Sequence, residues 1–240
     1  MTTGRLLGMC VTVAAIVAAA GPPARASQHL DDLAGRLELT PAGAPGWLAR
    51  LEDGAGAKAP ERLLALSDTG RLLATRFGGP SSVVLGPALD HEMLDSANAL
   101  VLVHNHPGNT GLSANDLEQL TKHGVVAIVA VAHDGGIYMA ARGPAFDENR
   151  FVRDQFPAMR LEVLRWVYME SLAGRLNPDT AASYISHLTS LALAQADVIE
   201  YRATLGATTA GEFHARVMIM DRVVSGAVSC QRRPHRPSSR

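Results

Sequence analysis

Two uninterrupted apolar runs constrain the fold of this chain more than any other feature of its sequence. Residues 99–103 and 125–132 contain only Ala, Val, Leu and Ile. Their short length and their Val content favour buried strands over helices. A hairpin pattern at residues 62–77 precedes them, a helical pattern lies between them, and a returning strand is indicated at residues 137–141. Since strands alternate with helices, we predict an α/β domain over residues 61–145.

The segments on either side of this domain have different patterns. Residues 27–60 hold leucines spaced for one short helix together with Gly- and Pro-containing stretches, so we interpret them as an N-terminal segment and linker. Residues 146–228 have apolar residues at helical spacing, and one helix is expected to run from Pro178 to about residue 205. We therefore predict an all-helical C-terminal region that positions a substrate or mediates assembly, followed by a basic, disordered tail at residues 229–240.

The first 26 residues have the order of parts of a secretory signal peptide. Arg5 precedes an uncharged, mostly apolar run of 15 residues at 6–20, and Ala24-Arg25-Ala26 forms a cleavage site before Ser27. The run is shorter than the stretch of about 20 residues that spans a bilayer. We expect an exported protein, periplasmic or secreted, that keeps no stable membrane anchor after cleavage. The alternatives are a retained anchor and a cytoplasmic protein whose start codon is placed too early.

Composition and charge exclude several classes of protein. Hydrophobic residues make up 47% of the chain and charged residues 19%, which excludes disorder as the default state. Twenty-two basic and 23 acidic residues leave a net charge of −1, so the strongly basic footprint of a dedicated nucleic-acid binder is missing. Two cysteines, Cys10 and Cys230, are too few for a disulfide framework or a cysteine-based zinc ribbon.

The sequence His-Asn-His-Pro directly follows the first apolar run. If the chain stays extended there, His104 and His106 point to the same side, because alternate residues of a strand do so. A helix starting at Ser113 places Asp116 in its first turn, where the helix dipole stabilises a carboxylate. Two imidazoles, one carboxylate and an open position form a common catalytic zinc shell. We therefore predict a Zn²⁺ site at His104, His106 and Asp116.

Taken together, the strand, His-Asn-His-Pro, the Gly-containing loop and Ser-x-x-Asp resemble the JAMM (JAB/MPN) metalloprotease motif, in the form of its bacterial RadC-like branch. The resemblance covers about residues 61–143. It implies a three-layer α/β fold similar to the cytidine deaminases, with zinc held by the two histidines and the aspartate. It also implies that Ser113 stabilises the oxyanion or water and that Glu61 activates the water. Members of the family cleave peptide or isopeptide bonds, so the implied partner is a peptide or protein substrate.

One departure from the family motif leaves the function open. Five residues, 108–112, separate Pro107 from Ser113, one fewer than in the better-known members. A zinc-dependent hydrolase of peptide or isopeptide bonds is our first interpretation. A catalytically inactive JAB-fold binding module would follow if the short loop misplaced Asp116 or if Glu61 faced away. A RadC-like DNA-associated protein is the third, against which the near-neutral charge and the expected export both weigh. No nucleic-acid partner is therefore expected, and the sequence does not predict an oligomeric state.

Overall fold

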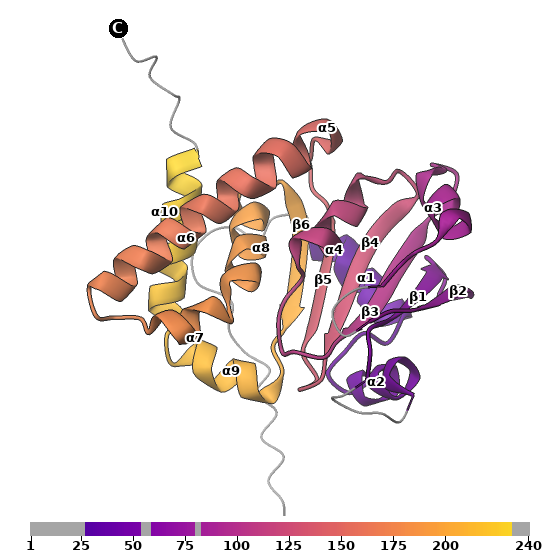
Figure 1. Ribbon diagram of the computed structural model, residues 1–240, viewed down its shortest axis with the longest axis horizontal. Helices are drawn as coiled ribbons and strands as arrows, with labels where there is room; N and C mark the ends of the chain where they lie inside the picture. Colours follow the sequence, from indigo (N-terminus) through magenta and orange to yellow (C-terminus); the bar gives the residue numbers. More distant parts are fainter. Residues whose placement is uncertain (1–26, 54–58, 80–82, 232–240) are drawn as a thin grey trace, which may run out of the picture.

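A six-stranded mixed sheet in the order β2-β1-β3-β4-β5-β6 forms the centre of the protein, as the computed structural model in Figure 1 shows. The structure describes residues 27–53, 59–79 and 83–231. The strands are β1 (Arg62–Ser67), β2 (Leu72–Phe77), β3 (Leu100–His106), β4 (Val125–Ala132), β5 (Ile137–Arg142) and β6 (Ile199–Thr204). Neighbouring strands run antiparallel except β3 and β4, which are parallel. The predicted α/β class and the predicted hairpin of β1 and β2 are confirmed.

Helices cover both faces of the sheet. The helices are α1 (Ser27–Arg36), α2 (Ala44–Glu52), α3 (Pro87–Leu94), α4 (Ala114–Glu118), α5 (Glu148–Arg150), α6 (Phe156–Leu172), α7 (Pro178–Ala182), α8 (Ile185–Gln195), α9 (Ala207–His214) and α10 (Val217–Gln231). A 3-10 turn at Gln119–Thr121 extends α4, and a π-helical turn at Phe151–Gln155 precedes α6. No helix among the described residues is long and apolar enough to cross a membrane.

Two buried clusters, one on each face of the sheet, explain the apolar runs. Val101 and Val103 of β3 pack in the cluster that contains α1 and α2, whereas Leu100 and Leu102 pack in the larger cluster with α6, α8 and α10. A strand that is covered on both faces has no polar side to expose, so its sequence reads as one apolar run. The helices and the sheet therefore form three layers.

The prediction of an all-helical C-terminal region is wrong at one element. Residues expected to continue a helix to about 205 form β6, which pairs antiparallel with β5 and extends the sheet. Ile199 lies in the larger cluster and Tyr201 packs against it, while Arg202 forms an ion pair at 2.9 Å with Asp31 of α1 on the other face. This alternation is the pattern of a strand with two different faces. The boundary predicted at residues 145 and 146 therefore does not separate the sheet from the C-terminal region.

The two ends of the chain also differ from their predicted descriptions. Residues 27–60 contain α1, where the predicted short helix lies, and also α2, which begins within the Pro-containing stretch interpreted as linker. Both helices are part of the folded core rather than a connection. At the other end α10 continues to Gln231, so the first residues of the predicted tail are helical. The predicted signal peptide at residues 1–26 and the rest of the tail at 232–240 lie outside the described residues.

Candidate metal centre

Strand β3 delivers both histidines of the His-Asn-His-Pro sequence to one end of the sheet. His104 pairs with Leu63 of β1 and with Ala130 of β4, which holds it between two neighbouring strands. His104 is 3% exposed and His106 is 7% exposed, so burial restricts both rings. The two Nε2 atoms lie 2.9 Å apart. In the structure the two imidazoles point toward one another, as predicted from the sequence.

A capping box at the start of α4 places the carboxylate of Asp116. The backbone N–H of Asp116 donates to Ser113 Oγ at 3.2 Å, and the backbone N–H of Ser113 donates to Asp116 Oδ2 at 2.6 Å. These reciprocal bonds satisfy two N–H groups that a helix start leaves unpaired. They also orient the carboxylate toward the sheet. The short loop between Pro107 and Ser113 therefore does not displace Asp116.

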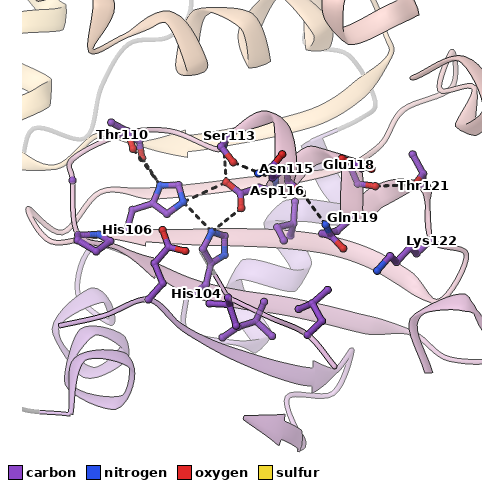
Figure 2. A pocket seen from close by; sticks show the side chains of 17 residues that line it. His104, His106, Thr110, Ser113, Asn115, Asp116, Glu118, Gln119, Thr121 and Lys122 are labelled. Carbon is purple, nitrogen blue, oxygen red and sulfur yellow. Dashed lines mark hydrogen bonds and ion pairs between the residues drawn. The ribbon is translucent and has the colours of Figure 1, made fainter. Parts of the chain in front are cut away.

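Three ligand atoms converge as a result, and Figure 2 shows the side chains of His104, His106 and Asp116 pointing toward one another. Oδ1 of Asp116 lies 3.1 Å from His104 Nε2, and Oδ2 lies 3.3 Å from His106 Nε2. Ligand atoms about 2.0–2.2 Å from a tetrahedral zinc ion are themselves about 3.3 Å apart. The separations within this triangle of side chains are close to that value, with Asp116 contributing a different carboxylate oxygen to each of its two contacts, so these three residues could hold a metal ion.

The electrostatics of the triangle favour a cation at its centre. Burial alone would raise the pKa of Asp116, but the charges and hydrogen bonds of the two histidines hold that pKa well below its usual range. Burial lowers the pKa of His106, yet the hydrogen bond and charge of Asp116 outweigh it and move the pKa upward. Two unprotonated Nε2 atoms beside a carboxylate would repel one another. A proton or a metal ion between them removes that repulsion.

A second hydrogen bond sets the tautomer of His106. Its Nδ1 lies 3.0 Å from the carbonyl oxygen of Thr110. Because a carbonyl can only accept, Nδ1 carries the hydrogen, and Nε2 of the neutral ring is left with a lone pair for a metal. His104 differs, since its buried Nδ1 has no hydrogen-bond partner among the described residues. Thr110, in the short loop, is a supporting residue that the sequence analysis did not identify.

Glu61 lies at the same cavity as the three ligands. The cavity has a volume of about 540 Å³, and its lining includes Glu61, Ser113 and the metal-ligand candidates. Backbone hydrogen bonds from Glu61 to Gly79 and from Gly78 to Glu61 hold it in register directly before β1. Burial raises the pKa of the Glu61 carboxyl above its usual value, while His104 and His106 oppose the shift. A carboxylate whose proton affinity is raised is suited to accept a proton near neutral pH.

Three other carboxylates, those of Glu52, Asp90 and Glu92, are engaged elsewhere. Glu52 lies 3.0 Å from Nδ1 of His133, and Asp90 forms an ion pair at 2.7 Å with Lys122. Glu92 accepts a hydrogen bond from Asn98 at 2.8 Å. None of the three lines the cavity that contains the ligand triangle. Glu61 is therefore the acid among these candidates that the fold brings to the site.

Asn105, the residue between the two histidines, is a second supporting residue that sequence reasoning missed. It is 1% exposed. Its Oδ1 accepts the backbone N–H of Arg62 at 2.7 Å, and its Nδ2 donates to the carbonyl of Pro60 at 3.3 Å. Asn105 thus binds the residues on both sides of Glu61. Its place in the motif was the only signal in the sequence, because the bonded partners lie more than 40 positions away.

No protein-family model, no curated protein and no solved structure matches this chain. A function therefore has to be inferred from the geometry of the site. That geometry consists of two buried histidines, a capping aspartate and a glutamate at one cavity.

Proposed function

We propose that this protein is a zinc-dependent metallohydrolase of the JAMM type that cleaves peptide or isopeptide bonds, on a fold similar to the cytidine deaminases. One observation carries the proposal. The Nε2 atoms of His104 and His106 and the carboxylate of Asp116 converge within 3.3 Å of one another at the cavity that Glu61 also lines. Two imidazoles and one carboxylate are a ligand set that zinc peptidases use.

Each residue then has a definite task. A zinc ion bound by the triangle would lower the pKa of a coordinated water from about 16 to about 7. Glu61 accepts the proton of the attacking water at its carboxylate and returns it to the leaving nitrogen. Ser113 Oγ is the acceptor in its bond to Asp116 N–H, so its hydroxyl hydrogen can be donated to the developing oxyanion.

The test separates metal binding from catalysis. Protein purified without chelator is analysed for metal by mass spectrometry, and hydrolysis is followed on a fluorogenic peptide library and on denatured casein. We expect about one zinc per chain in the wild type, in Glu61→Gln and in the control Glu92→Gln, and loss of zinc in His106→Ala. Hydrolysis should fall at least 100-fold in Glu61→Gln and be unchanged in Glu92→Gln.

Two results would contradict the proposal. The first is wild-type protein that binds no stoichiometric metal even after zinc is supplied, which would favour the binding-module interpretation. The second is hydrolysis that survives in Glu61→Gln at the wild-type rate. Circular dichroism of His106→Ala and of the milder His106→Gln tells loss of a ligand from loss of the fold.

A further inference from the structure

A second cavity of about 420 Å³ lies beside the metal-centre cavity. One wall is α4, and the other is formed by the π-helical turn and the first half of α6. Its apolar lining comes mainly from Phe151, Val152, Phe156, Leu161 and Leu164, which we call the apolar groove. All five belong to the C-terminal region, outside the segment that carries the metal-binding motif. This groove has no role in the function proposed above.

The two cavities share lining residues on α4. Asn115 and Glu118 line both of them. They lie one helical turn apart, and both are exposed, so they form a polar ridge between the metal centre and the groove. Figure 2 places both residues on the same short helix as Asp116. A chain that crosses this ridge reaches from the ligand triangle into the groove.

The floor of the groove is preformed by the π-helical turn. The backbone N–H of Phe156 donates to the carbonyl of Phe151, five residues earlier. In an α-helix residues five apart lie about 140° apart around the axis, and the wider π turn reduces this angle. The ring centroids of Phe151 and Phe156 lie 6.1 Å apart, and those of Phe146 and Phe151 lie 4.8 Å apart. An aromatic floor of this kind needs no rearrangement to accept an apolar group.

The rim of the groove exposes apolar side chains to solvent. Val152 is 43% exposed and Leu161 is 65% exposed. Single exposed apolar residues are ordinary, but a concave cluster beside a candidate catalytic site is typical of a ligand-binding surface. Asn115 and Glu118 on the ridge offer an amide and a carboxylate, which can bond the N–H and C=O groups of a peptide backbone. A lipid chain has no such groups, so the combination favours a polypeptide.

We propose that the apolar groove binds a large apolar side chain of an extended polypeptide substrate whose scissile bond lies at the metal centre. This inference rests on the proposed function and adds the class of substrate: peptides with an aromatic or large aliphatic residue a few positions from the cleaved bond. Successive residues of an extended chain advance by about 3.3 Å, so neighbouring cavities are bridged within a few residues. The C-terminal region supplies this selectivity.

Binding is measured on Glu61→Gln loaded with zinc, so that peptides are not consumed. The probes are fluorescein-labelled decapeptides of Gly and Ser with one Phe moved through successive positions, and the readout is fluorescence anisotropy. An extended decapeptide is at most about 36 Å long. We expect Phe at one register to tighten binding about tenfold or more over the peptide without Phe.

Two matched variants, made in the Glu61→Gln protein, locate the effect. Leu161→Asp should abolish the preference for Phe, and Leu172→Asp should keep it. Leu161 and Leu172 are 65% and 66% exposed on the same helix, but Leu172 does not line the groove. Since both side chains are largely in solvent, neither change should unfold the protein, and thermal unfolding checks this. Val152→Asp is a second groove variant and should act like Leu161→Asp.

The outcomes separate the two proposals. Three results would contradict the proposed role of the groove. They are the absence of a Phe preference at every register, a Phe preference that persists in Leu161→Asp, and a Phe preference that is lost in Leu172→Asp. Zinc-dependent hydrolysis at a rate independent of the position of Phe would contradict the proposed role of the groove and support the proposed hydrolase activity. A Phe preference in a wild-type protein that holds no metal would support a peptide-binding groove and contradict the proposed hydrolase activity.

Discussion

At the scale of single residues, the middle position of His-Asn-His-Pro connects the metal ligands to Glu61. Adjacent side chains of a strand point to opposite sides, so Asn105 faces away from the two histidines. It bonds the backbone of Arg62 and of Pro60 and thereby holds the segment that carries Glu61 against β3. The position of Glu61 relative to the candidate metal ligands therefore depends on a residue that belongs to neither group.

Asn105→Ala tests this positioning role. The change leaves the N–H of Arg62 and the carbonyl of Pro60 without these partners, so we expect a loss of about 1–3 kcal/mol in unfolding free energy. Zinc content should stay near one per chain while peptide hydrolysis falls about tenfold or more. Urea unfolding, metal analysis and hydrolysis rates are the measurements. Asn98→Ala, which removes a partly buried asparagine bonded to Glu92, is the control.

Equal hydrolysis by Asn105→Ala and the wild type at equal zinc content would show that Asn105 does not position Glu61. Loss of zinc together with activity would place its effect on the ligands instead.

At the scale of elements, α8 supports the loop that follows the histidines. A Cβ atom at Gly111 would lie 3.3 Å from the backbone N and Cα of His187, so the loop approaches the helix closely. His187 is buried, and its Nδ1 lies 2.9 Å from the hydroxyl of Tyr201 on β6. Helix α8, strand β6 and the loop that contains Gly111 are thus packed as one unit. His187 supports this packing and is not part of the ligand triangle.

The titration of His187 at this contact is expected to make the stability of the protein depend on pH. Burial lowers the pKa of His187 to about 4, below its usual value of 6.5. The contribution of the neutral ring is therefore fully present above pH 6.5 and is lost as the pH falls toward 4. We expect the unfolding free energy of the wild type to fall over that range. The fall should be smaller in His187→Gln, and the difference between the two proteins should be about 3 kcal/mol at most.

Urea unfolding of both proteins at several pH values between 7 and 4 gives the comparison. His106 titrates in both, so the difference between the two curves isolates His187. Parallel curves would show that His187 is not held neutral by the fold.

At the scale of the whole molecule, α1 and α2 cover one face of the sheet. Leu33 and Trp47 are buried with Val101 and Val103 of β3, and the indole N–H of Trp47 donates to the carbonyl of Leu37 at 3.0 Å. Strand β3, which carries the histidines on its last residues, is therefore held between two helical layers. The N-terminal helices contribute to the candidate metal centre by holding in place the strand that carries its two histidines.

Leu33→Ala tests that contribution. Leu33 is fully buried, so its truncation should lower the unfolding free energy by about 2–5 kcal/mol. Leu72→Ala, at a leucine that is 49% exposed on β2, should change it by much less. Thermal and urea unfolding measure both. Equal stability of the two variants would restore the interpretation of residues 27–60 as a linker.

The sequence by itself determined the features that depend on near neighbours. The apolar runs of β3 and β4, the hairpin, the two histidines separated by one residue, and the capping box of Ser113 and Asp116 all rest on residues a few positions apart. Periodicity and capping are local physics, so they can be read without a fold. For the same reason the three candidate metal ligands were predicted together.

Only the tertiary structure decided which distant segments meet. The strand pattern of residues 199–204 is too short to be distinguished from the helical patterns on either side of it. These residues form strand β6 because they pair with β5. The segment that carries Glu61 is held beside the histidines by Asn105, whose hydrogen-bond partner Arg62 lies 43 positions away in the sequence. The apolar groove joins α4 to a π-helical turn and α6. These contacts depend on how whole faces bury apolar surface, and no window of neighbouring residues contains that information.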